Sequence, residues 1–510
     1  MTAPPPDPAE AAIAETEAPR PGLSLEAELP PALADRLRRL PALTAQRSGR
    51  SRGAALSLIW LDTALGDLAE QGLVLEQPRR GPRRLLRVLP EEGIAWQPGS
   101  LPDLVAEFAP DSVPEEAGGA ALIPLAAFEG RRTALGLQGE VEAVILHGRL
   151  RAVAAEAPAL RLRLSGPSAA VLASFRALTQ EIPVLPPRAA LPEMARALAR
   201  GEPIRPRRLG APILDPEMGV EDALRLLIGH LTEVLLWHAP TAALGEDPTG
   251  VHQMRVAIRR LRSALRAFRP AADGPALRRF DAEARDLANV LGPARDWDVF
   301  LGGLGAEIAE ALPEEPRIEA LLRAATARRE TAYANLRATL AGPGFRGLIW
   351  DAVALTETLP WRAEGDADAA ERRARSLPDF AAGVIEKRWR KLTEVGPEIG
   401  ELPDDEFHAL RLEGKRVRYV AELFAPLWAR KRGKRFLARL AEVQEAFGLA
   451  NDAAVARALV APLGAKGGGA SPWAVGMAEG WALARARRAR SRATGAWEEL
   501  LAGEPFWSQG

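Results

Sequence analysis

The sequence predicts an α+β chain with two parts: an N-terminal antiparallel β-barrel, followed by an all-helical bundle built from two pseudo-symmetric halves. Three observations predict this. A chain of 510 residues is too long for one ordinary core. Its first part contains short apolar or alternating runs separated by Gly and Pro, which is typical of strands. Its second part contains long segments rich in Ala, Leu, Arg and Glu, which are typical of helices, and these segments are duplicated.

Composition narrows the function classes. The 67 Lys and Arg balance 67 Asp and Glu, and 47% of the residues are hydrophobic, so the chain as a whole is globular and not uniformly basic. The absence of cysteine excludes disulfides, thiol nucleophiles and thiolate zinc sites. The few histidines limit any histidine-built metal centre to these positions: His147, His230, His238, His252 and His408.

The elements of the first part follow from local patterns. Alternating or apolar runs predict the strands Leu56–Trp60, Arg84–Leu89, Val141–Leu146 and Leu160–Leu164. Apolar spacings of three and four predict two short helices, Ala32–Leu40 and Ala169–Thr179. Proline and glycine stretches then place the domain borders: a disordered tail at 1–21, the barrel at 22–200, a linker at 201–215, and helical repeats at 216–365 and 366–510. With no export signal and no long apolar run, a soluble, cytoplasmic protein without membrane contact is expected.

The helical part contains a gapless duplication. The stretch from His252 to Arg262 matches the stretch from His408 to Arg418 at an offset of 156 residues. Phe268 and Pro270 recur at the same offset, and the segment 292–296 matches 448–452. Such a register predicts two copies of one multi-helix unit about a pseudo-twofold axis. The segment 292–296 and its match are predicted to be turns near helix ends, where their carboxylates cap helices or orient arginines.

Each copy carries a basic stripe. On a helix, the steps of three and four from His252 to Arg269 form one cationic face, and Met254, Ile258, Leu261, Leu265 and Phe268 form a separate apolar line. Such a stripe is usually a solvated face balanced by nearby carboxylates. Here no acidic residue occurs from Val251 to Arg269, so a polyanion shared by both stripes is the favoured interpretation. Arginine suits phosphate because its planar fork donates two hydrogen bonds.

The candidate anion ligands come from the two stripes and one further basic cluster. They are His252, Arg255, Arg259, Arg260, Arg262, Arg266, His408, Arg411, Lys415, Arg416, Arg418, Lys431, Lys434 and Arg435.

The paired His-x-x-Arg-x-x-x-Arg/Lys-Arg-x-Arg helices resemble the CHAD family, the conserved histidine α-helical domain, from about Pro216 onward. The resemblance implies a two-halved helical bundle that binds inorganic polyphosphate in a basic groove. It also implies binding roles for the stripe residues, including His252, Arg255, His408 and Arg411.

CHAD domains often follow a CYTH domain, the triphosphate tunnel fold, and the first part resembles a degenerate one. Leu25-Glu26-Ala-Glu28 is similar to the start of the family's Glu-x-Glu-x-Lys strand, but Pro30 stands at the Lys position. Arg161 and Arg163 stand where the family has a strand with alternating glutamates. The resemblance therefore implies the fold without the charges for metal and triphosphate.

Two functions remain. The first is polyphosphate binding without catalysis and without a cofactor, at polyphosphate granules in the cytoplasm. The second is a metal-dependent triphosphatase or polyphosphatase in the first part, for which Glu26 and Glu28 alone are a thin basis. Nucleic acid is disfavoured because aromatic residues make up 5% of the chain and none interleave the stripes. The sequence leaves the polymer length and the oligomeric state open.

Overall fold

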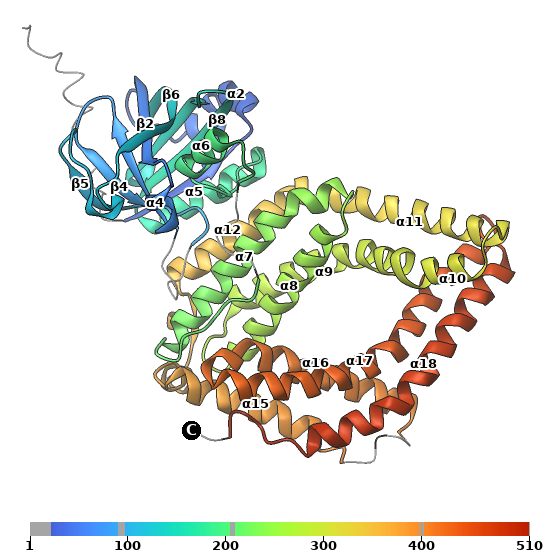
Figure 1. Cartoon of the computed structure of the whole chain (residues 1–510). Coiled ribbons are helices and arrows are strands. Elements are labelled where there is room, and N and C mark those ends of the chain that lie inside the picture. The colour runs from blue at the N-terminus through green and yellow to red at the C-terminus, as the bar shows by residue number, and fades with distance from the viewer. Residues whose placement is uncertain (1–21, 90–96, 205–209, 397–398, 400–401, 509–510) are drawn as a thin grey trace, which may run out of the picture. The chain divides into compact units, whose positions relative to one another are not determined.

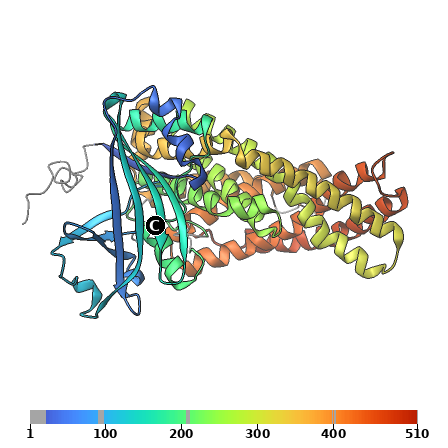
Figure 2. The same cartoon turned by 90° about the horizontal axis from the view of Figure 1, so that it is seen from above.

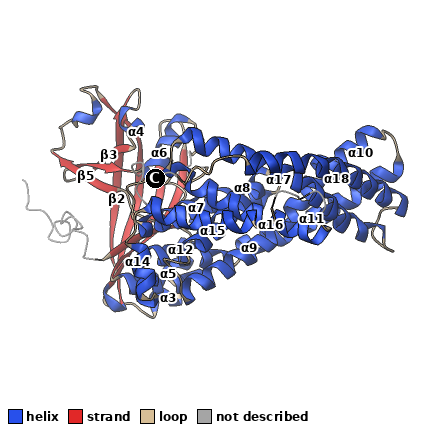
Figure 3. Ribbon diagram, turned by 90° about the horizontal axis from the view of Figure 1, so that it is seen from below, coloured by secondary structure: helices blue, strands red, loops and turns tan. Residues whose placement is uncertain are grey.

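The computed structural model describes residues 22–89, 97–204, 210–396, 399 and 402–508. The predicted tail at 1–21 lies outside these residues. The chain divides into two compact units, one of residues 1–209 with 346–359, the other of residues 210–345 with 360–510. Figure 3 shows the strands gathered in the N-terminal unit. The helix α12 (Pro343–Thr358) lies almost wholly in the segment that belongs to the N-terminal unit, although it is distant in sequence.

The N-terminal unit is built on one curled antiparallel sheet (Figure 2). Its strand order is β1-β8-β7-β6-β2-β3-β4-β5. This half-barrel confirms the predicted barrel class. The strands are β1 (Leu23–Glu28), β2 (Arg52–Thr63), β3 (Leu73–Pro78), β4 (Arg83–Arg87), β5 (Asp103–Phe108), β6 (Leu122–Leu137), β7 (Val141–Arg151) and β8 (Glu156–Gly166). Short α-helices accompany the sheet: α2 (Ala34–Arg38), α3 (Pro41–Thr44), α4 (Asp67–Glu70), α5 (Ser168–Glu181) and α6 (Leu191–Arg200).

One core of this unit lies between the sheet and the helices α5 and α12. The ring of Trp350 on α12 stacks on Phe175 of α5 with centroids 3.9 Å apart. Its indole N–H donates to the carbonyl of Val184 at 3.1 Å. Because alternate residues of a strand face opposite sides, Leu160, Leu162 and Leu164 of β8 enter this core together.

In the described part of the second unit the regular elements are helices, as predicted for the second part of the chain, and one isolated β-bridge joins Gly219 to Ser376. Its first half contains α7 (Val220–Leu244), α8 (Thr249–Phe268), α9 (Pro275–Phe300), the π-helical turn η4 (Leu301–Gly305), α10 (Ala306–Ala311) and α11 (Pro316–Ala341). Its second half contains α13 (Trp361–Glu364), α14 (Ala367–Arg373), α15 (Leu377–Thr393), α16 (Asp404–Phe424), α17 (Arg430–Val460) and α18 (Pro472–Leu501). Figure 1 shows α8 and α9 facing α16 and α17.

The two halves meet through an aromatic cluster near one end of the motif helices α8 and α16. Phe268 of α8 contacts Phe424 of α16 and Phe380 of α15, with ring centroids 5.6 and 5.3 Å apart. Phe268 and Phe424 are the same position of the duplication and both are fully buried. The cluster therefore holds the two copies together at equivalent residues, in agreement with a pseudo-twofold arrangement.

Candidate anion-binding site

The cationic face of α8 is fixed by the burial of its opposite face. The predicted apolar line is confirmed: Met254, Ile258, Leu261, Leu265 and Phe268 are all 7% exposed or less. Since side chains three and four positions apart share a face, burying this line turns the basic stripe away from the helical core. The stripe then faces a cavity between the two halves of the helical unit.

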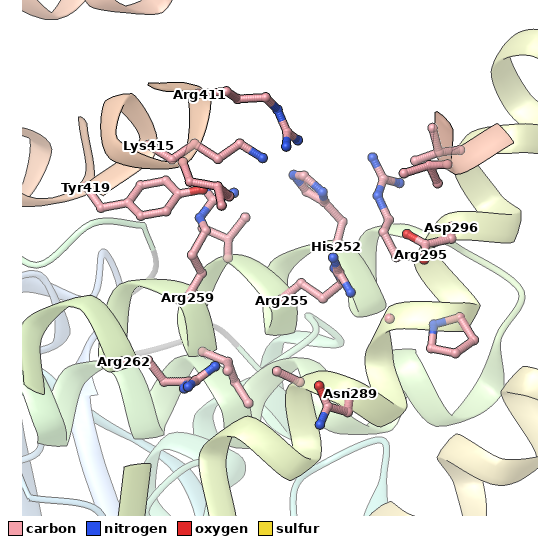
Figure 4. A pocket seen from close by; sticks show the side chains of 18 of the residues that line it. His252, Arg255, Arg259, Arg262, Asn289, Arg295, Asp296, Arg411, Lys415 and Tyr419 are labelled. Carbon is pink, nitrogen blue, oxygen red and sulfur yellow. The ribbon is translucent and has the colours of Figure 1, made fainter. Parts of the chain in front are cut away.

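This cavity has a volume of about 1180 Å³. Figure 4 shows His252, Arg255 and Arg259 of α8 facing Arg411 and Lys415 of α16. Of the residues that the structure describes, ten basic side chains and two carboxylates, Asp296 and Glu307, line it. The basic residues are Arg255, Arg259, Arg262, Arg266, Arg295, Arg388, Arg411, Lys415, Arg416 and Arg485.

The structure brings together eight of the predicted ligands and leaves out six. Lining the cavity are His252, Arg255, Arg259, Arg262, Arg266, Arg411, Lys415 and Arg416. Not lining it are Arg260, His408, Arg418, Lys431, Lys434 and Arg435. Arg418 lines a smaller adjoining cavity. The binding roles of the remaining five residues stay predictions.

Three lining cations were missed as ligands by the sequence pattern. Arg295 comes from α9, Arg388 from α15 and Arg485 from α18. Arg295 could have been named as a ligand from the sequence, because it lies inside the repeated segment 292–296. The other two lie in the basic clusters 387–391 and 485–492. By sequence the second cluster could extend the cationic surface, but solvated helix faces are the usual explanation of either, and the packing of α15 and α18 places both residues in the cavity wall.

The predicted turns at 292–296 and 448–452 are wrong. The first segment lies inside α9, with Pro293 in the helix, and the second lies inside α17. A Cβ atom at Gly292 would be 3.3 Å from Nη1 of Arg255. In the first copy the glycine thus provides room for a guanidinium beside the helix. The side chains of 448–452 lie outside the described residues.

Acidic residues near the cavity are engaged with particular arginines. Arg262 donates to Asp281 of α9 at 2.8 Å, so a partner from another helix neutralises one member of the stripe. Asp298 accepts from Arg329 at 2.7 Å and from the hydroxyl of Tyr333 at 2.8 Å, a role in orienting an arginine rather than capping a helix. At the rim, Glu307 of α10 accepts from Arg485 at 2.8 Å.

The pKa shifts in the cavity reflect burial first and neighbouring positive charge second. Partial burial, followed by the charges of Arg295, Arg259 and Arg255, lowers the pKa of His252. Burial lowers the pKa of Arg255 and of Arg266, and neighbouring arginines add to both effects. Burial raises the pKa of Asp296 against the pull of Arg255 and Arg295. The guanidinium groups stay protonated at neutral pH, so an incoming anion finds them poorly compensated.

The aromatic ring of Tyr419 also lines the cavity, among the basic side chains. The guanidinium of Arg259 lies over the ring of Tyr419, 4.7 Å from its centroid. This cation–π contact joins α8 to α16 across the cavity and holds Arg259 near Lys415.

The carboxylates of the N-terminal unit have a different environment. Glu26 on β1 accepts from Arg163 on β8 at 2.7 Å, and Glu28 pairs with Arg161 at 3.0 Å. Arg161 and Glu26 are 1% and 2% exposed, and the antiparallel register aligns Glu26 with Arg163 and Glu28 with Arg161. The arginines that replace the expected glutamates are thus the ion-pair partners of the two remaining glutamates. Among the described residues, no group of three or more His, Asp or Glu is placed to hold a metal ion.

Comparison with known proteins identifies the helical unit. Residues 226–461 match the family model of the CHAD domain. This match identifies residues 226–461 as a CHAD domain, and the N-terminal unit outside it is a curled antiparallel sheet of eight strands with its helices.

Two curated relatives match over part of their length. Each is an uncharacterised protein of Mycobacterium tuberculosis, from strains CDC 1551 and H37Rv, 28% identical over 207 residues. The match covers 40% of this chain and 40% of either relative.

Three solved structures are similar in part. The CHAD domain from the plant Ricinus communis is 25% identical, with a TM-score of 0.49, and covers 59% of this chain and 97% of its own. PptA from Streptomyces chartreusis is 19% identical, with a TM-score of 0.41, and covers 55% of this chain and 100% of its own. The putative adenylyl cyclase HpAC1 from Hippeastrum, described as revealing a dominant triphosphatase activity, is 16% identical, with a TM-score of 0.27 and coverages of 37% and 99%.

None of the helices in the described part of the chain combines the length and apolar character needed to span a membrane.

Proposed function

We propose that this protein binds inorganic polyphosphate in the cavity between its two helical halves. One observation carries the proposal: among the described residues, ten basic side chains from both halves and two carboxylates line one cavity. The CHAD family match is consistent with polyphosphate as the anion. A chain of linked phosphates provides one negative charge at each step and so neutralises many cations with one molecule.

The proposal is tested by titrating the full chain with long-chain polyphosphate, triphosphate, orthophosphate and DNA at several salt concentrations. Long polyphosphate is expected to bind most tightly, with an affinity that falls steeply as salt rises because bound phosphates release counterions. Binding that is independent of salt, or equal affinity for orthophosphate, contradicts the proposal.

We propose further that the protein does not hydrolyse triphosphate. The acids that would hold a metal in the N-terminal unit are paired with Arg161 and Arg163, and a metal-dependent hydrolase needs free carboxylates. The alternative is a metal-dependent triphosphatase in that unit. Turnover with Mg²⁺ or Mn²⁺ that disappears in Glu26→Gln or Glu28→Gln would favour the alternative.

In a cell that stores polyphosphate, the protein is proposed to concentrate on the granules in the cytoplasm. A fluorescent fusion of the full chain tests this, with Arg255→Glu/Arg411→Glu as the control. A diffuse wild-type signal beside visible granules, or granules still decorated by the variant, contradicts the localisation.

A further inference from the structure

A second cavity adjoins the large one, with a volume of about 380 Å³. Three residues, Arg259, Lys415 and Tyr419, line both cavities and so form a shared wall. The second cavity is completed by Arg418 of α16 and by Ala441, Gln444 and Glu445 of α17. A polymer that reaches the shared wall from the large cavity is therefore next to this space.

Gln444 is the unusual member of this lining. Its side chain is 6% exposed, and its Nε2 has no hydrogen-bond partner within the described part of the protein. A Cβ atom at position 414 would lie 2.6 Å from this nitrogen, so Gly414 leaves room for the amide. A buried amide without an acceptor is costly, typically by about 1–3 kcal/mol, and a bound acceptor oxygen removes that cost.

The charges around the second cavity are mixed. Arg259, Lys415 and Arg418 are cationic, while Glu445 also lines the space. Arg418 donates to Glu422 at 2.7 Å. The local field therefore favours an anion only modestly, and a neutral donor such as an amide contributes a comparatively large share of the recognition.

The duplication shows that the buried amide of Gln444 occurs in the second half and has no equivalent in the first. At the offset of 156 residues, Gln444 corresponds to Ala288, which lines the large cavity. Arg418 corresponds to Arg262, which also lines the large cavity and pairs with Asp281. The second half thus has an amide at a position where the first half has a methyl group.

We propose that the second cavity is a subsite for a further phosphate group of the same polyphosphate chain, with Gln444 and Arg418 as its hydrogen-bond donors. This inference rests on the proposed function, because the chain reaches the subsite by way of the large cavity. The subsite makes affinity depend on chain length: a long polymer fills both cavities, while triphosphate is held by the large cavity alone.

The test compares triphosphate with long-chain polyphosphate by calorimetry on the full chain. Gln444→Ala introduces the residue that the first half carries at this position, and Arg418→Gln removes the second donor. Each is expected to weaken long-chain binding by about 2- to 10-fold, the usual range for one lost hydrogen bond, and to leave triphosphate binding unchanged. Equal losses for both ligands, or no loss for either, overturn the subsite.

Glu445→Gln is a control that is expected to change the affinity for long-chain polyphosphate in the opposite direction. Glu445 is exposed, so the substitution is tolerated by the fold, and removing a carboxylate beside a phosphate is expected to strengthen long-chain binding alone. An unchanged or weaker long-chain affinity contradicts the subsite even if the Gln444 variant were unstable. Failure of the wild-type protein to bind either ligand refutes the proposed function itself and is therefore a separate result.

Discussion

The two motif helices, α8 and α16, began as copies of one sequence and now have different electrostatic environments. The α8 stripe contains no acid, and its neighbours lower the pKa of His252 through their positive charge. The α16 stripe contains Glu413, which pairs with Arg416 and with Lys391 at 3.0 Å, and Glu422, which pairs with Arg418. The comparison teaches that the two copies share the direction of the stripe, while only the second carries counterions on the stripe helix itself.

The two motif histidines, His252 and His408, also have different surroundings. His252 lines the large cavity, whereas His408, at the matching position near the start of α16, is exposed and does not line it. Sequence symmetry predicts equal roles for the two. The surroundings of each imidazole indicate a larger role for His252.

The largest effect is expected from reversing charges on either helix. Arg255→Glu/Arg259→Glu and Arg411→Glu/Lys415→Glu are each expected to weaken long-chain polyphosphate binding by at least about 100-fold, because two attractions become repulsions at short range. The α8 pair is expected to lose more, since no acid lies on that helix. Arg328→Glu, an exposed residue of α11 that lines neither cavity and is not a candidate ligand, is the matched control. Normal binding by either folded double variant contradicts a shared cavity.

A smaller effect is expected from the histidines. His252→Ala is expected to weaken binding by about 3- to 10-fold, the size of one charge-assisted hydrogen bond. His408→Ala is expected to change the affinity by less than about twofold, as is usual for an exposed side chain. The two affinities, measured side by side, decide whether the copies are functionally equivalent, and equal losses restore the symmetric interpretation.

The pH dependence sharpens the comparison further. In the free protein the pKa of His252 lies below its usual value, so the imidazole is neutral at pH 7. A bound polyanion favours the charged form and raises this pKa, so binding takes up a proton and strengthens as the pH falls through the window between the free and bound values. Between pH 7.5 and 5.5 the wild-type affinity is expected to rise about 2- to 5-fold more than that of His252→Asn. Calorimetry in two buffers of different ionisation enthalpy measures the proton, and zero uptake at every pH refutes the coupling.

The smallest effect is expected from removing a counterion of the second copy. Glu413→Gln releases Arg416, which lines the cavity, and Lys391 from their shared carboxylate. Long-chain binding is expected to tighten by about twofold, because Arg416 and Lys391 are half exposed and solvent already screens much of their charge. A weaker affinity in a folded variant would show that Glu413 positions these cations rather than competing with the ligand.

Local patterns alone predicted much of this protein. The step of three and four residues fixes which side chains share a helix face, so the amphipathic α8, with its buried line and basic stripe, could be predicted from Met254 to Phe268. Alternation predicted strands that lie within β2, β7 and β8. The turn predicted at 292–296 was wrong. A Gly-Pro pair usually marks a turn, whereas Gly292 here lies inside a helix beside Arg255.

The sequence by itself determined the two-part architecture, the duplication and the direction of each basic stripe, because these depend on short-range periodicity. Only the tertiary structure decided which cations share the cavity and which have partners. Arg388 and Arg485 line it because α15 and α18 pack beside α16 and α17, and Arg262 is paired because α9 brings Asp281 to it. Helix periodicity says which way a side chain points, but the residue that it meets belongs to an element distant in the chain, whose position is set by packing.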